Sequence, residues 1–139
     1  MKPASSGRAW SRATIASAAL ATVLSAAACP LPAPRPGEQR LTEGAVQLSW
    51  STEPAQLAVG LPFSVSMQLC PPTAQLLRVD ATMPEHRHGM NYRPSVKPMG
   101  DGRWRAEGLL WHMAGRWEMA FQVESGGEWM WLRQAVQLP

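Results

Sequence analysis

Apolar and polar residues alternate with a period of two along most of the chain from residue 44 onward. The clearest stretch is FSVSMQL at residues 63–69, where every second side chain is apolar and those between are Ser or Gln. A strand with one buried and one exposed face produces this pattern. No segment keeps a helical period over about ten residues. The predicted strands cover residues 46–50, 63–69, 77–83, 96–99, 104–106, 117–123 and 128–138.

Turn residues separate these strands. Met-Gly-Asp-Gly at residues 99–102 and Ser-Gly-Gly at residues 125–127 predict tight hairpins, because these residues accept the positive φ that such turns need. The 13 Pro and 11 Gly also fit a turn-rich β domain better than a helical bundle. About seven short strands are typical of an immunoglobulin-like antiparallel β-sandwich. We therefore predict an all-β sandwich over residues 44–139, with a small closed barrel as the alternative.

The alternation also predicts which side chains face the core. The residues expected there include Met67, Leu77, Val79, Ala81, Met83 and Met119. In the last strand, Trp129 and Trp131 share the face opposite to Met130 and Leu132. We expect both faces of that strand to be buried. The alternative is an exposed Trp pair, which would mark a surface for a partner.

The first 28 residues have the order of a secretory signal peptide. Lys2, Arg8 and Arg12 precede the uncharged, Ala-rich segment at residues 13–28, and Cys29 follows it directly. Basic, apolar and small residues in that order direct a chain out of the cytoplasm. The Pro-rich residues 29–43 that come next predict a linker. We therefore place the domain in the periplasm or another extracytoplasmic compartment.

Cys29 has two further interpretations. Ala26-Ala27-Ala28 permits ordinary cleavage after a small residue, and it also permits a lipoprotein signal in which Cys29 becomes the lipid-modified first residue. We favour lipidation of Cys29, hence a membrane-anchored lipoprotein, over plain secretion or an uncleaved anchor. Cys70 is then a lone thiol. It would be buried and inert, act as an extra soft metal ligand, or pair with another protein.

Charge excludes one class of partner. The chain has 13 Lys and Arg against 10 Asp and Glu, and three of the basic residues lie within residues 1–12. The domain itself is therefore neutral. A nucleic-acid module would keep a basic face, so we expect no nucleic-acid partner.

The three histidines are grouped with methionines in two segments. His86, His88 and Met90 follow one predicted strand, and His112-Met113 precede another. Loops gather at the two ends of a sandwich, so the two segments are expected to meet. Imidazole and thioether donors together favour copper, as Cu(I) or Cu(II), over zinc, calcium or magnesium. The candidate metal ligands are His86, His88, Met90, His112 and Met113, with Met99 undecided and Met83 assigned to the core.

Motifs for catalysis are absent from the sequence. There is no Gly-rich phosphate loop, no Gly-x-Ser-x-Gly and no His-Glu-x-x-His. Glu85 beside His86 is a neighbour in sequence and does not define an acid–base pair. We therefore do not expect an enzyme.

A set of short motifs supports a family resemblance. They are Met83-Pro84, His88-Gly89-Met90, Gly100-Asp101-Gly102 with an aromatic residue at 104, and Met113 followed by Gly115-Arg116-Trp117. With these marks, residues 81–123 closely resemble the YtkA-like domain, a group of small extracytoplasmic domains akin to the soluble part of FixH proteins. The resemblance implies an immunoglobulin-like sandwich that is similar to periplasmic copper-handling proteins of the CopC type. This chain departs from the pattern at His86 and Arg87, where members are often Met-rich, and at Ala114, where Pro is more typical.

Two functions follow from these observations. The first is a copper buffer or chaperone that exchanges the ion with a donor or acceptor protein and needs no catalytic turnover. The second is a structural or interaction domain without metal, which docks a membrane or periplasmic partner through its Trp-rich C-terminal strands. The two differ in whether the histidines of the two segments converge on one ion, about 2.0–2.1 Å from an imidazole nitrogen.

Overall fold

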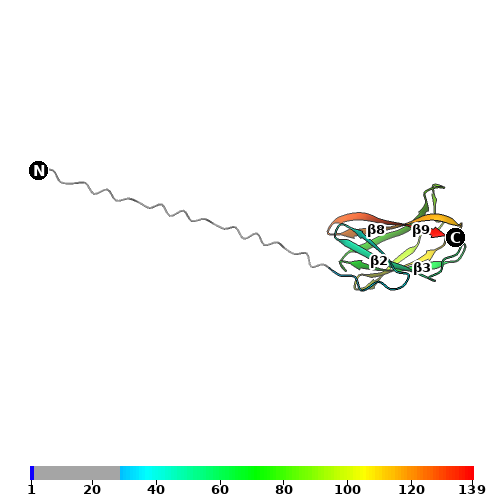
Figure 1. Cartoon of the computed structure of the whole chain (residues 1–139), viewed down its shortest axis with the longest axis horizontal. Coiled ribbons are helices and arrows are strands. Elements are labelled where there is room, and N and C mark those ends of the chain that lie inside the picture. Colours follow the sequence, from blue (N-terminus) through cyan, green and yellow to red (C-terminus); the bar gives the residue numbers. More distant parts are fainter. Residues whose placement is uncertain (2–28) are drawn as a thin grey trace.

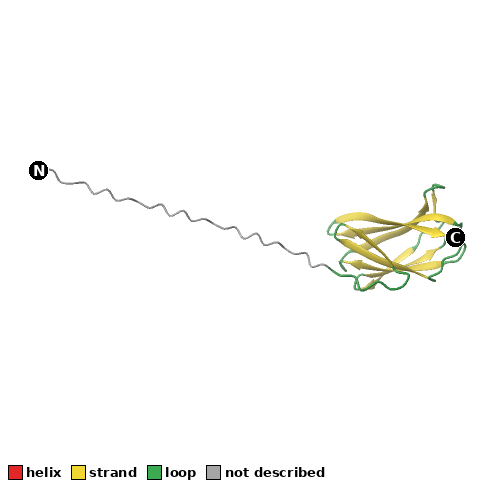
Figure 2. Ribbon diagram, viewed as in Figure 1, coloured by secondary structure: helices red, strands yellow, loops and turns green. Residues whose placement is uncertain are grey.

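Two antiparallel sheets face one another in a β-sandwich (Figure 2). The computed structural model describes Met1 and residues 29–139. Within that part of the chain there are nine strands and no helix. Their bounds are β1 Gln39–Glu43, β2 Val46–Glu53, β3 Phe63–Cys70, β4 Gln75–Met83, β5 His88–Gly89, β6 Ser95–Gly100, β7 Arg103–Leu109, β8 Gly115–Ser125 and β9 Glu128–Leu138.

The sheets have five and four strands, in the orders β1-β2-β3-β7-β6 and β5-β4-β8-β9. Figure 1 shows the two layers, with β2 and β3 in one and β8 and β9 in the other. Every paired strand runs antiparallel to its neighbour. The predicted immunoglobulin-like sandwich is confirmed, and each of the seven predicted strands is present with longer or equal bounds.

Two short strands were not predicted. β1 lies inside residues 29–43, which the sequence assigned to the linker, and it pairs with β2 through Leu41 and Leu48. The domain boundary at residue 44 is therefore too late. β5 has only two residues and pairs with the end of β4, where His88 lies opposite Met83. Both strands are held by backbone pairing at sheet edges, so neither needs an alternating apolar face.

The core lies between the sheets and follows the alternation, with one shift. A bulge between Leu76 and Arg78 turns Leu76 inward and leaves Leu77 53% exposed, so the expected core position of Leu77 is wrong. The other expected core residues are buried. The largest fully buried side chains are Trp111, Trp117, Phe121, Leu48, Leu69, Met83, Leu109, Met119, Leu138, Val46, Val65 and Val79.

The predicted hairpin at residues 99–102 joins β6 to β7. Its two turn residues, Asp101 and Gly102, have φ of 53° and 72°, as a two-residue type I′ turn requires. The Leu69 N–H of β3 donates to the Gly102 carbonyl at 2.8 Å, so the turn is also tied to the neighbouring strand. Gly102 itself is buried, although it lies in a turn.

The loops gather at the two ends of the sandwich. We call one the cysteine end: it holds Cys70, the β3–β4 loop and the β6–β7 and β8–β9 turns. We call the other the histidine end: it holds the β4–β5 and β7–β8 loops and Leu138, beside the C-terminus marked in Figure 1. β3 has eight residues, so at about 3.3 Å per residue the two ends lie roughly 25 Å apart.

Candidate metal centre

A tight turn after β4 positions the first two histidines. The Met83 carbonyl accepts from the N–H groups of His86 and Arg87 at 3.2 and 2.9 Å. Arg87 has a φ of 54°, which reverses the chain so that His88 returns beside the end of β4. His86 is left exposed on the turn, whereas His88 is half-buried.

The loop between β7 and β8 positions the third histidine. It is fixed at its start, where the Trp111 carbonyl accepts from the Gly60 N–H at 2.8 Å. Further on, the Trp117 indole Nε1–H donates to the Met113 carbonyl at 3.1 Å. His112 lies between these two contacts and is half-buried.

The two loops bring the histidines together. The ring centroids of His88 and His112 are 5.1 Å apart, and those of His86 and His88 are 5.6 Å apart. The expectation that the segments at residues 86–90 and 112–113 meet is therefore confirmed. His88 lies between the other two imidazoles and belongs to both pairs.

Two imidazole nitrogens at this place have no partner. The Nδ1 atoms of His88 and His112 are buried, and no protein group of the described residues forms a hydrogen bond with either. A buried polar atom without a partner costs about 1–3 kcal/mol, so proteins seldom leave one without a reason. Two such atoms therefore lie on neighbouring rings that come from different loops.

Tryptophan rings form the inner wall of the site. Trp117 is fully buried and meets the His112 ring edge-on, with centroids 5.4 Å apart at 84°. It meets His88 at 6.2 Å and 66°, and it stacks on Trp111 at 5.7 Å and 5°. This wall closes the site toward the core and limits the orientations that the imidazoles can adopt. The sequence did not point to Trp117 as part of the site.

The methionines divide into two groups. Met90 and Met113 are half-buried at the histidine end and pack against the edge of the core. Met83 is 1% exposed, as its assignment to the core predicted, and Met99 is 53% exposed on β6, away from the histidines. Across residues 29–139, no three side chains of His, Cys, Asp or Glu gather as a metal site. A metal site here would therefore have to combine the imidazoles of His88 and His112 with thioethers or with His86.

The two cysteines form a disulfide at the other end of the sandwich. Cys29 and Cys70 are bonded, with Cα atoms 5.6 Å apart. Cys70 is the last residue of β3 and is 2% exposed. It is therefore too far from the histidines to act as an extra soft ligand. An even number of cysteines in an extracytoplasmic chain is the sequence signal for such a bond. The sequence analysis did not predict the bond because it assigned Cys29 to lipid attachment. Lipidation remains a prediction that excludes this bond.

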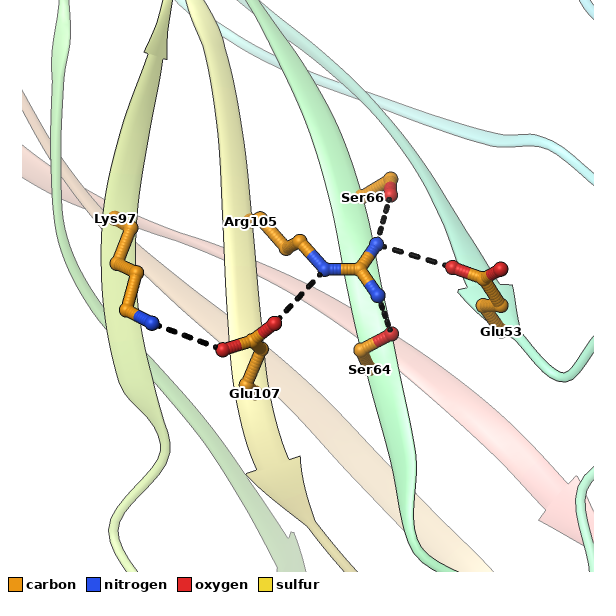
Figure 3. Close-up of polar contacts among 6 residues, drawn as sticks. All are labelled: Glu53, Ser64, Ser66, Lys97, Arg105 and Glu107. Atoms are coloured by element: carbon orange, nitrogen blue, oxygen red, sulfur yellow. Dashed lines mark hydrogen bonds and ion pairs between the residues drawn. The ribbon is translucent and has the colours of Figure 1, made fainter.

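A second polar cluster lies on the outer face of the five-stranded sheet (Figure 3). The guanidinium of Arg105 in β7 donates hydrogen bonds of 2.8 to 3.3 Å to the side chains of Glu53, Glu107, Ser64 and Ser66. Lys97 of β6 donates to Glu107 at 3.0 Å. Hydrogen bonds from Lys97 and then Arg105 lower the pKa of Glu107, and those to Glu53 and then Glu107 raise the pKa of Arg105. These groups satisfy one another across four strands, so the cluster supports the sheet.

The last strand does not have two buried faces. Trp129 is 68% exposed, and Trp131 is half-buried under the Arg133 guanidinium, which lies 5.1 Å from its ring centroid. The expectation of burial on both faces is therefore wrong for Trp129. The reason is that Trp129 lies on the outer face of the four-stranded sheet, which in a sandwich of two sheets has no further sheet to cover it.

Comparison with known proteins adds no relative to this picture. No family model, no curated protein and no solved structure matches the chain. Within residues 29–139 there is no helix of the length and apolar character needed to cross a membrane. The predicted signal peptide, residues 1–28, lies outside the described residues apart from Met1.

Proposed function

We propose that this protein binds a copper ion at the histidine end and acts as an extracytoplasmic copper buffer or chaperone. One observation carries the proposal. The Nδ1 atoms of His88 and His112 are buried without partners on rings whose centroids are 5.1 Å apart. A metal ion between them would satisfy both atoms at once.

The remaining donors favour copper. Met90 and Met113 belong to the same two loops, and their thioethers would extend a site of two imidazoles. Thioether sulfur suits Cu(I), and imidazole suits copper in both oxidation states. His86 is exposed beside His88, so it would serve as a ligand for the incoming or departing ion.

The position of the site suits exchange of the ion with another protein. His86 is exposed, so a donor or acceptor protein would meet this imidazole first, and the ion would then pass to the buried Nδ1 atoms of His88 and His112. Transfer would proceed by ligand exchange and requires no catalytic residue. The proposed compartment is the periplasm or its equivalent. Lipid at Cys29 would hold the chain at the membrane and would exclude the disulfide with Cys70.

The experiment is a titration of the disulfide-intact domain with Cu(II) in air and with Cu(I) under anaerobic conditions. One equivalent is expected to bind and to quench tryptophan fluorescence, because Trp117 contacts both imidazoles. His88→Ala and His112→Ala should each abolish the tight equivalent, whereas His86→Ala should retain it with weaker affinity. Met99→Leu is the matched control, since Met99 lies on β6 outside the site.

Absence of binding in the parent chain would exclude the copper function. Binding that survives both His88→Ala and His112→Ala would place copper elsewhere and would equally contradict the assignment. Preference for Cu(I), lost in Met90→Leu or Met113→Leu, would add the thioethers to the ligand set.

A second candidate function rests on Trp129. Trp129 is 68% exposed, on the same outward face of β9 as Trp131 and Arg133. Such a surface suits a periplasmic or membrane protein partner. If copper does not bind, Trp129→Ser should reduce association with a partner found by crosslinking of the wild-type chain in cells.

A further inference from the structure

The sulfur of Cys29 has two mutually exclusive fates. In the sequence, Cys29 directly follows the apolar segment at residues 13–28, where a lipoprotein signal places the residue that accepts lipid. In the structure, the same sulfur is bonded to Cys70. One thioether or one disulfide uses the full bonding capacity of a cysteine sulfur, so a single chain has one or the other.

The fold brings the two cysteines together by holding the segment between Cys29 and β1. The Arg40 guanidinium donates to the Pro32 carbonyl and to the Glu38 carboxylate, and the Glu38 N–H donates to the Arg35 carbonyl at 3.0 Å. The segment therefore follows the domain back to the cysteine end. Cys70 lies there at the end of β3 and is almost completely buried. The folded sandwich and this segment together hold the two sulfurs within bonding distance.

The two reactions have different co-reactants. In lipid attachment, the Cys29 thiolate attacks a glyceryl carbon of a phospholipid, a C–S bond forms, and the C–O bond to the phosphate headgroup breaks. The headgroup leaves as a phosphate ester, and the thiol proton passes to solvent. In disulfide formation, the two thiols lose two electrons and two protons to an extracytoplasmic thiol–disulfide oxidant, whose own disulfide is reduced to a dithiol.

We propose that Cys70 competes with lipid attachment for the sulfur of Cys29, and that the chain consequently has two mature forms. One form is lipid-free and closed by the Cys29–Cys70 disulfide. The other is anchored by lipid at Cys29 and carries Cys70 as a free, buried thiol. The competition takes place at the cysteine end, so it is independent of copper binding at the histidine end.

The test compares full-length chains in a bacterium that attaches lipid to lipoproteins. Wild type, Cys70→Ser, Cys70→Ala and the control Thr73→Ser are separated into membrane and soluble fractions. Each fraction is unfolded without reductant and treated with iodoacetamide, which alkylates free thiols. The mass of the intact chain is then measured by mass spectrometry. Thr73 is exposed three residues beyond Cys70, so its substitution leaves both sulfurs in place. Circular dichroism establishes that each variant folds.

In wild type, lipid-free chains should gain no alkyl group and lipid-bearing chains should gain one. Both Cys70 variants should shift material from the lipid-free to the lipid-bearing form, and Thr73→Ser should not. Equal lipid-bearing shares in wild type and in both Cys70 variants would overturn the competition. Two alkyl groups on lipid-free wild-type chains, or a complete lack of lipid in every variant, would overturn it as well.

Discussion

Gly102 is the position at which the smallest added side chain should cost the most stability. A Cβ atom built there would lie 2.7 Å from the Leu69 carbonyl oxygen and 2.9 Å from the Pro72 Cα. Both are backbone atoms, so neither can move without displacing β3 or the loop after it. The φ of 72° adds a second cost, since L residues other than Gly are strained there.

The two costs are separable because the same turn contains a matched control. Gly100 has a φ of 84° and nothing within 4 Å of a built Cβ, so Gly100→Ala should show the strain alone, about 1–2 kcal/mol. Gly102→Ala should show the strain plus a steric term of about 1–3 kcal/mol, as for overpacking of a core. We therefore expect the free energy of unfolding to fall by about 2–5 kcal/mol in Gly102→Ala.

Urea unfolding, followed by tryptophan fluorescence, measures both variants against the parent. The copper-free, disulfide-intact domain is used so that neither metal nor redox state differs between samples. Equal losses in the two variants, within about 0.5 kcal/mol, would refute the close approach of the hairpin to β3. A loss confined to Gly102→Ala would instead show that the positive φ at Gly100 carries no cost.

Two other predictions concern the disulfide and pH. The bond between Cys29 and Cys70 joins residues that are 41 apart in the sequence. Its reduction should therefore lower the free energy of unfolding by up to about 4 kcal/mol. A control variant with Ser at both positions should not respond to reductant. A melting temperature that is the same with and without reductant in the parent would contradict this. Because the pKa of Glu107 is held below its unfolded value, its stabilisation is present above about pH 4.3 and is lost as pH falls through the folded pKa. Glu107→Gln should therefore flatten the acid side of the profile of melting temperature against pH, and an unchanged profile would show that Lys97 and Arg105 do not act on Glu107.

The sequence was sufficient for the strands that have one buried face. Residues 63–69 and 117–123 alternate without interruption, and both lie in β3 and β8 as predicted. It was not sufficient for β1, whose sequence QRLTE has a single apolar residue and whose order comes from backbone pairing with β2. The sequence also did not predict the bulge at residues 76–78. One extra residue leaves the composition of the strand unchanged while it exchanges Leu76 for Leu77 at the core.

For the candidate site, spacing predicted the meeting of two loops but not its details. His88 and His112 were expected to approach because loops of a sandwich gather at its ends, and they do. The unpartnered Nδ1 atoms and the Trp117 wall depend on side-chain packing that no local pattern records. The disulfide depends on the course of residues 30–38 over the domain, which a Pro-rich composition leaves undetermined.

The separation of the cysteine end from the histidine end gives the molecule a direction. In the disulfide-bonded form, Cys29 is held at the cysteine end, a strand length or roughly 25 Å from His86. A soluble metal carrier would then meet the histidine end without contacting the disulfide. Residues at one end are also too distant to contact those at the other, so substitutions at the two ends should be additive in their effects on stability.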